Sequence, residues 1–442
     1  MTAGRLGVPV AVGALALGLG VLAGFSPWLA VAAGGAVALG LVGTTRPDWL
    51  VPLVFLAMLF DQAGVTGAKV DEFPVTASKL AVLGTISAWV LHALLRGVSP
   101  FRWHPVLGAM LTFLASTAVC VAASNSLKYG KFTLFGLVMM LMMVAVVYAI
   151  LLERTLDGLF RFVAACLVVA LAIAVIRSGG AGESGRATGT MGDPNEWATM
   201  VLLLVPTCLG ALGNDDHSAA PALRLGLLLL GPLAVLASGS RSALVVGLVV
   251  FPGSLLLLRR RAGEIAAAGV IGLVAAPFLV DPSEAVRRFS SLWARFSGNA
   301  PAASDDSLSE RAELFRQGVA LFVDHWFTGA GPGMFSRATG FVSHTGRFRP
   351  AHNTYLEIAG EQGIVGLLTA AIFIVVVGLA LRRGLLAARD EAARARVMGV
   401  SLGLFAVAAM AATLGLLTFA MAYLVLGLAL AVVKQAERGL VR

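Results

Sequence analysis

The sequence predicts an all-α, polytopic integral membrane protein with about 12–14 transmembrane helices and one large external loop. Hydrophobic residues make up 58% of the 442 residues and charged residues only 13%, whereas soluble domains are about half apolar and about a quarter charged. The apolar residues fall in runs of roughly 17 or more with few charges, which is long enough for a helix to cross the hydrocarbon core. The chain is therefore expected to bury its apolar surface against lipid and neighbouring helices.

The apolar runs follow one another along most of the chain. The run at 48–61 is short for a crossing, and Pro206 and Pro232 are expected to kink or interrupt the helices that contain them. The last two runs form one apolar stretch, which is too long for a single crossing of a core ~30 Å thick. The predicted spans are residues 8–25, 27–44, 48–61, 76–95, 105–123, 131–152, 156–176, 196–213, 222–238, 242–258, 264–280, 362–381, 396–413 and 416–433.

The distribution of basic residues predicts the orientation in the membrane. With the N-terminus in the cytoplasm, more than half of the Lys and Arg residues, including the triplet at 259–261, lie in short cytoplasmic loops or tails, as the positive-inside rule requires. Both termini are then cytoplasmic. Arg5 followed by the run at 8–25 imitates a signal peptide, but further spans follow at once, so we expect an uncleaved first helix.

The net charge of +9 does not indicate a nucleic-acid partner. The basic residues lie between apolar runs, where they set topology and contact anionic lipid or phosphate groups. Cys120, Cys166 and Cys208 all fall inside apolar runs, so they supply neither a disulfide framework nor a zinc pattern.

Two segments are longer than the other connections, at 177–196 and 281–360, and both are external in the predicted topology. The second contains too many aromatic residues for a disordered segment and a helical pattern at Ser309–Phe327. We therefore divide the chain into a transmembrane region at 1–280, a large periplasmic loop with short helices at 281–360 and C-terminal transmembrane helices at 361–442.

A polar cluster stands at the mouth of the predicted span at 362–381. Ionisable groups at that depth are costly and are usually kept for function. The alternative interpretation is that His352 is a surface loop residue and that Glu361 is a helix N-terminal charge stabilised by the dipole. The cluster comprises His352, Asn353, Tyr355, Glu357 and Glu361.

Three external arginines stand beside glycine or serine residues: Arg186, Arg241 and Arg311. The planar guanidinium group suits bidentate binding of phosphate oxygens, and nearby Gly and Ser let backbone N–H groups approach the same anion. Arg241 also begins an apolar helix, where the dipole favours an anion. The alternatives are snorkelling at the membrane interface for Arg241 and solvated loop charges for Arg186 and Arg311.

Other polar residues give weaker signals. Asp193 precedes a predicted helix and is explained as its cap. His325 and His344 match no zinc spacing when taken with His352, and no G-x-S-x-G elbow is present. The sequence GAGPG at 329–333 lacks the context of a phosphate loop and predicts a turn. We therefore expect neither a metal nor another cofactor.

The external arginines and His352 suit glycosyl transfer from a lipid pyrophosphate. The arginines would bind the pyrophosphate, and the histidine would take a proton from a hydroxyl group. The same groups would equally suit the gate of an anion transporter, so these residues alone leave both alternatives open.

Four stretches together resemble the bacterial O-antigen ligase and polymerase superfamily. They cover about a hundred residues of the C-terminal two-thirds, and the first 170 residues match only as hydrophobic spans. The four in this order are specific, although each alone is weak. They are GRATGTMGDPNEWA at 185–198, SGSRSALVVGLVV at 238–250, SERAELFRQGVALFVDHWFTGAGPGMF at 309–335 and AHNTYLEIAGEQGIVGLL at 351–368.

The resemblance implies a GT-C-like membrane glycosyltransferase whose large periplasmic loop covers the active site. It implies a glycan donor linked to undecaprenyl pyrophosphate, a lipid or glycan acceptor, and a location in the bacterial inner membrane with the active site facing the periplasm. The implied chemistry is a metal-independent single displacement with inversion.

The resemblance also assigns roles to individual residues. His352 takes the place of the histidine that activates the acceptor hydroxyl, and Arg186 and Arg241 occupy the positions of donor-binding arginines. Arg311 matches a loop arginine, as Arg288 does on a poorer local match. The expected supporting residues are Asn353, Tyr355, Glu361 and Asp193.

The motifs do not separate a ligase, which moves a finished glycan onto an acceptor such as lipid A-core, from a polymerase, which joins undecaprenyl-linked repeat units. The late position of the long loop favours the ligase. An anion transporter should contain paired, interrupted helices in two related halves, and the sequence has no such internal symmetry. That favours an enzyme.

Overall fold

The computed structural model describes residues 43, 45–60, 69–70, 73–74, 77–124, 127–178, 187–191, 193–279, 290, 306–340 and 351–439. Apart from Gly43, the predicted spans at 8–25 and 27–44 lie outside these residues. Within them the chain is a bundle of helices, with one antiparallel pair of two-residue strands, β1 (Lys69–Val70) and β2 (Phe73–Pro74).

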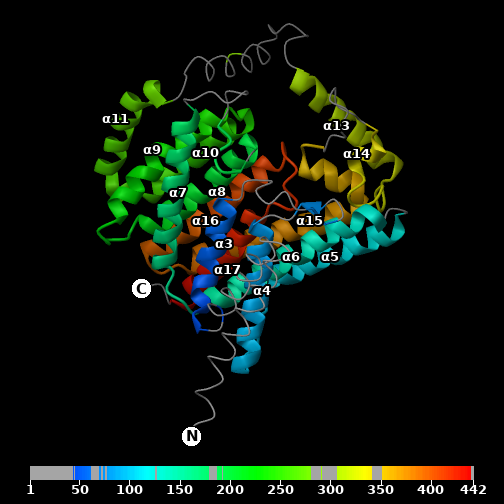
Figure 1. Cartoon of the computed structure of the whole chain (residues 1–442), viewed down its shortest axis with the longest axis horizontal. Helices are drawn as coiled ribbons and strands as arrows, with labels where there is room; N and C mark the ends of the chain where they lie inside the picture. The colour runs from blue at the N-terminus through cyan, green and yellow to red at the C-terminus, as the bar shows by residue number, and fades with distance from the viewer. Residues whose placement is uncertain are drawn as a thin grey trace, which may run out of the picture.

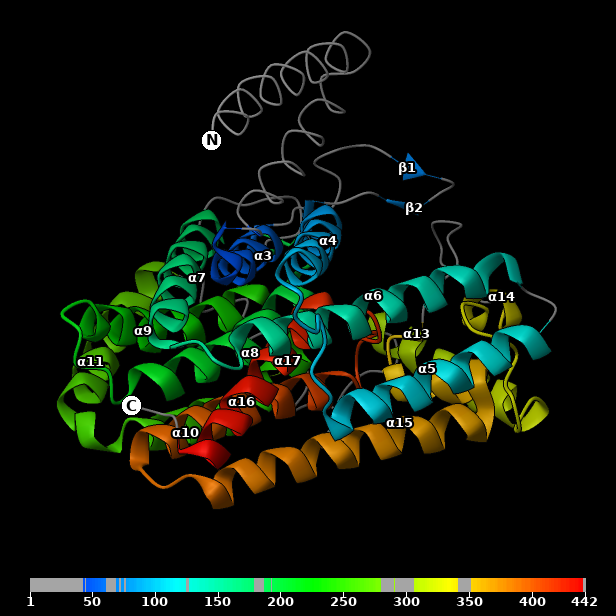
Figure 2. The same cartoon turned by 90° about the horizontal axis from the view of Figure 1, so that it is seen from below.

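The described part of the chain contains nine helices that are long and apolar enough to cross a membrane. Each corresponds to a predicted span, which confirms an all-α polytopic membrane protein (Figures 1 and 2). Pro206 and Pro232 lie inside their helices, which continue through them. The nine are α4 (Ala77–Arg96), α5 (Pro105–Ala123), α6 (Leu127–Leu151), α7 (Asp157–Ser178), α8 (Pro194–Leu212), α9 (Ala220–Ser238), α15 (Thr354–Ala387), α16 (Glu391–Met410) and α17 (Ala420–Arg438).

Three other predicted spans differ from a simple crossing. The run at 48–61 forms a 3-10 turn and then α3 (Leu50–Leu59), and its 10 residues are too few for a helix that rises about 1.5 Å per residue. The runs at 242–258 and 264–280 form α10 (Arg241–Leu257) and α11 (Ala262–Leu279), which are bent by 79° at a short break, as in a broken span or a re-entrant loop. The bend lies directly before the arginine triplet at 259–261, which forms a 3-10 turn.

The predicted large loop contains two described helices, α13 (Asp306–Asp324) and α14 (Phe335–Ala338). The first confirms the helix expected at Ser309–Phe327. Both lie beside the start of α15 at one end of the bundle (Figure 1). Figure 2 shows α5 running alongside α15 for much of its length.

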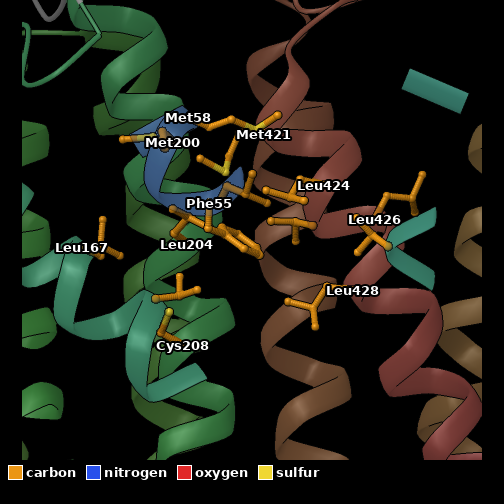
Figure 3. Packing of buried hydrophobic residues seen from close by; sticks show 14 of the residues in the cluster. Phe55, Met58, Leu167, Met200, Leu204, Cys208, Met421, Leu424, Leu426 and Leu428 are labelled. Atoms are coloured by element: carbon orange, nitrogen blue, oxygen red, sulfur yellow. The ribbon is translucent and has the colours of Figure 1, made fainter. Parts of the chain in front are cut away.

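Helix α8 forms the centre of the bundle. Small residues let α16 approach it closely, because a Cβ atom at Gly210 or Gly399 would strike a backbone carbonyl of the other helix, as is common where transmembrane helices pack. Around this contact α3, α7 and α17 add apolar side chains such as Phe55 and Leu167 (Figure 3). This packing fixes the position of α16, and the α16–α17 connection begins where α16 ends.

Ion pairs between helix ends and short connections lie at one end of the bundle, which we call the basic end. The end of α17 is fixed there too, since the Gln435 side chain donates to the carbonyl oxygens of Leu151 (3.0 Å) and Arg154 (2.9 Å). The pairs are Arg154–Asp48 (4.0 Å), Arg161–Asp215 (3.5 Å), Arg224–Glu264 (2.6 Å), Arg259–Glu391 (2.7 Å), Arg260–Glu391, Arg261–Asp216 (2.8 Å), Arg396–Asp157 (2.7 Å) and Lys434–Glu437 (2.7 Å).

Arg224 is the buried centre of this end, with 1% of its side chain exposed. Its Nε and Nη2 donate to the two carboxylate oxygens of Glu264, both at 2.6 Å, and its Nη1 donates to the carbonyl oxygens of Leu212 and Asp215. Arg224 therefore satisfies the carboxyl end of α8 while joining α9 to α11.

We expect Glu264→Ala to lower the free energy of unfolding by about 3–5 kcal/mol, because it leaves the buried Arg224 without its counter-charge. The control is Arg259→Ala, which breaks an ion pair whose arginine is 71% exposed and should cost less than about 1 kcal/mol. Thermal unfolding in detergent compares the two. Equal shifts in Tm would contradict a special role for the buried pair.

Candidate functional site

The opposite end of the bundle holds His352, so we call it the His352 end. Helix α15 begins directly after it because the Asn353 side chain caps the helix, accepting a hydrogen bond from Leu356 N at 3.0 Å. The first turns of α15 therefore lie in the stretch predicted as loop. His352 itself is half-buried and is the one non-glycine residue with a positive φ (+49°) in the described part of the chain. A left-handed backbone at such a residue is unusual and marks candidate functional sites.

The start of α15 is fastened to the α16–α17 connection. Thr354 donates through Oγ1 to Leu414 O (2.7 Å), and the same hydroxyl accepts from Leu416 N (2.7 Å). The Tyr355 hydroxyl donates to Ala408 O at 2.7 Å. Tyr355, expected as a supporting residue, thus holds α15 against α16. Together with Thr354 it fixes the backbone that directly follows His352.

Helix α13 packs over the first turns of α15. Its Leu314 and Leu321 join Phe335, Ala351 and Leu356 in a small apolar cluster. On the outer face of α13, hydrogen bonds from Arg316 and Gln317 hold the pKa of the Glu313 carboxyl below its usual value.

Through this cluster α13 brings Arg311 to the His352 end. Arg311 lies one turn before Leu314, and Ala351 directly precedes His352.

Helix α15 is broken at Gly363, where φ is +61° and ψ is −154°. The break leaves backbone groups without partners inside the helix, and the segment between α13 and α14 supplies those partners. Ala330 N donates to Gly360 O (2.9 Å), Gly331 N to Glu361 O (3.0 Å), Ile364 N to Trp326 O (2.8 Å) and Val365 N to Phe327 O (3.3 Å).

Glu361 completes this contact. The residue is 2% exposed, and its carboxylate accepts hydrogen bonds from Gly333 N and Phe335 N, both at 2.8 Å. The predicted turn at 329–333 is confirmed, with positive φ at Gly329 and Gly333. In this structure Glu361 binds the backbone of the loop. It therefore holds the segment between α13 and α14 against α15.

Arg241 is half-buried at the first position of α10, which packs against α8 and α16. The chain next to Arg186 is tied to the same corner, because Ala187 N donates to Ala237 O at 2.9 Å. Arg186 itself and Arg288 lie outside the described residues. Asp193 caps α8 by accepting from Asn195 N (2.7 Å) and Glu196 N (3.0 Å), as the alternative interpretation of this residue stated.

An apolar cavity of about 190 Å³ begins beside the first turn of α15. It extends from Thr354 and Tyr355 between α5, α6, α15, α16 and α17 to Val377 and Leu426, with Leu416 and Leu417 of the α16–α17 connection in its wall. Sequence reasoning missed this cavity, because its lining comes from five helices whose runs all have the same apolar composition.

The described residues contain no group of three or more His, Cys, Asp and Glu side chains placed to bind a metal ion. Of the predicted site residues, the His352 end holds the imidazole of His352, the guanidinium groups of Arg241 and Arg311, and the carboxylates of Asp193 and Glu361, which accept backbone hydrogen bonds. Their chemistry is therefore anion binding and proton transfer.

Residues 225–371 match the family model described as O-antigen ligase. The matched segment is about a third of the chain and runs from α9 to the middle of α15, so it includes Arg241, Arg311, His352 and Glu361. Comparison with the curated proteins gives no match.

Proposed function

We propose that this chain, which residues 225–371 place in the O-antigen ligase superfamily, transfers a glycan from undecaprenyl pyrophosphate to a lipid or glycan acceptor. The family indicates a membrane enzyme of the glycan ligase or polymerase type. The observation that carries the finer proposal is His352, fixed in a left-handed backbone at the start of α15 and at the same end of the bundle as Arg241.

The proposed step is a single displacement. The acceptor hydroxyl oxygen forms a bond to the anomeric carbon of the donor sugar while the bond to the pyrophosphate oxygen breaks, and the configuration inverts. His352 takes the hydroxyl proton, and the electron pair of the broken bond stays on the pyrophosphate. The arginines Arg241, Arg311, Arg186 and Arg288 are proposed to stabilise that charge.

The apolar cavity supports a lipid-linked donor. Nearly all its lining is aliphatic or aromatic, and it begins at Thr354, two residues after His352. An isoprenoid chain seated there gains free energy from apolar contact and leaves its pyrophosphate at the His352 end. The donor would then approach His352 from within the membrane.

The ion pairs support the orientation. The basic end includes the arginine triplet at 259–261 and the C-terminal turns of α17, which the positive-inside rule assigns to the cytoplasm. The His352 end then faces the periplasm, and the C-terminus is cytoplasmic.

The test is reconstitution of the purified protein with an undecaprenyl-pyrophosphate glycan and candidate acceptors in EDTA, followed by mass spectrometry. A single glycan on a lipid or glycan acceptor establishes a ligase, whereas a ladder of lengthened undecaprenyl-linked products establishes a polymerase. A donor that stays intact with every acceptor offered contradicts the proposal.

Arg241→Ala is expected to lower the transfer rate by about 10²–10³-fold, the usual loss when one electrostatic donor to a developing charge is removed. Arg382→Ala serves as the control, because Arg382 is an exposed residue near the other end of α15. Initial rates at saturating donor measure both variants. Wild-type rates in Arg241→Ala would exclude Arg241 from the donor site.

A further inference from the structure

A second cavity, of about 520 Å³, opens at the His352 end between α3, α4, α6, α8 and α17. Its volume is within the range of about 300–1,000 Å³ that is usual for small-molecule sites. One wall is formed by Gly415 and by Thr418–Met421 of the α16–α17 connection and the start of α17. Met58 and Met421, which both line it, lie near each other in Figure 3.

The lining of this cavity is mixed, in contrast to that of the apolar cavity. It contains the Glu196 carboxylate, the Lys79 ammonium group, and the hydroxyl groups of Ser78, Thr133 and Thr418. The remaining surface includes five methionine side chains and aromatic rings such as that of Phe132. Such a site offers hydrogen-bond donors and acceptors next to apolar surface.

Glu196 is the group in this lining that most clearly calls for a ligand. It lies in the first turn of α8, where the helix dipole favours the charged form, and its side chain is half-buried. Among the residues that the structure describes, its carboxylate forms no hydrogen bond or ion pair. A carboxylate withdrawn from water without a partner is costly, so a ligand that donates hydrogen bonds to it would recover that cost.

The chemistry of the lining points to a sugar. A saccharide ring presents several hydroxyl groups, which donate to a carboxylate and accept from an ammonium group or a hydroxyl. Its C–H faces pack against aromatic and methionine side chains. A lipid chain would leave the Glu196 carboxylate without a hydrogen-bond donor, and a simple anion would be repelled by it.

The position of the cavity indicates which of the two substrates contributes the saccharide that it binds. The α16–α17 connection separates the two cavities, with Leu416 and Leu417 facing the apolar cavity and Gly415 and Thr418 facing the mixed one. The same connection is bonded to Thr354, and Gly415 lies against the Glu357 carboxylate one turn further along α15. An enzyme with two substrates needs two sites, and the apolar cavity is the one suited to the donor lipid.

We propose that the mixed cavity binds the saccharide of the acceptor, with Glu196 accepting hydrogen bonds from its hydroxyl groups. This inference rests on the proposed function, in which the donor lipid occupies the apolar cavity. Glu196 acts as a substrate-binding and specificity-determining residue. Thr418, in the wall formed by the α16–α17 connection, supplies a further hydrogen bond.

The test is steady-state kinetics of the reconstituted protein with donor and acceptor varied separately. Glu196→Gln keeps the size of the side chain and is expected to raise KM for the acceptor about tenfold or more. Thr418→Val, which removes only a hydroxyl, is expected to raise it by a smaller factor. In both variants kcat and KM for the donor stay within about twofold of wild type. Glu153→Gln, which removes an exposed carboxylate near the basic end, is the matched control and leaves all three constants unchanged.

An unchanged acceptor KM in Glu196→Gln overturns the assignment, as does a change confined to the donor KM. A second measurement does not depend on turnover: native mass spectrometry of the protein in detergent with deacylated lipid A-core oligosaccharide. The wild type and Glu153→Gln are expected to bind it, and Glu196→Gln to lose most of that binding. Wild-type protein that transfers glycan but does not bind this saccharide overturns the cavity assignment alone. Binding without transfer in any reconstitution contradicts the proposed function while leaving the saccharide site supported.

Discussion

Replacing His352 with asparagine is expected to lower the rate of glycan transfer by about 10²–10⁴-fold, the usual contribution of a positioned general base. The choice of asparagine follows from the backbone. His352 has a φ of +49°, and asparagine tolerates that left-handed conformation, whereas alanine would add backbone strain to the loss of the imidazole. The variant therefore separates the chemistry of the side chain from the fold of the α15 start.

The measurement is the initial rate in the reconstituted reaction, together with Tm in detergent. An unchanged Tm with a rate lowered by two orders of magnitude or more supports a direct role in proton transfer. His325→Asn is a suitable control, because His325 is also a histidine of the external loop and follows α13. Retained transfer in His352→Asn would show that the acceptor is activated by another group.

Most helix boundaries could be predicted because the residues at each boundary determine where the helix begins or ends. The span at 105–123 coincides with α5, which begins at a proline in the first helical position and is capped by His104, whose Nδ1 accepts from Val106 N. Charged residues and turns close such runs on both sides. A run of apolar residues bounded in this way needs no tertiary information to be recognised.

The break in α15 could not be predicted in the same way. Glycines at 363 and 366 were visible at the start of an apolar run, but glycine is common in transmembrane helices. The partners of Gly363 and Glu361 come from residues 326–335, in a different element. Only tertiary structure shows that Glu361 binds a loop backbone, although its sequence position equally suited a substrate contact or a helix-dipole charge.

The second cavity was missed for a related reason. Lys79, Thr133, Glu196 and Thr418 are far apart in the sequence, and each taken alone is an ordinary polar residue near the end of a span. In the sequence, Glu196 belongs to the helix start that Asp193 caps, and nothing there marks it as a binding residue. Its withdrawal from water follows from the packing of α8 against the other helices, which periodicity does not encode.

Gly363→Ala is expected to disrupt the contact between α15 and the external loop, and with it both stability and transfer. The φ and ψ of Gly363 belong to a region that is nearly restricted to glycine, with a cost of about 1–3 kcal/mol for another residue. An added Cβ would also overlap the carbonyl oxygens of Trp326 and Phe327, which accept the bonds that close the break. We therefore expect Gly363→Ala to break several of the hydrogen bonds between α15 and the external loop at once.

The matched control is Gly378→Ala. Gly378 lies in the same helix, and a Cβ atom there meets no atom within 4 Å beyond its own stretch of the helix, so alanine should be neutral or slightly stabilising. Limited proteolysis with trypsin, which cleaves after Arg316 and Arg337 in α13 and α14, compares the two variants with wild type. Faster cleavage and lost transfer in Gly363→Ala alone are the expected result. Equal cleavage in all three proteins would mean that α13 and α14 are held without the break, and Arg311 would then owe its position to the apolar cluster around Leu314.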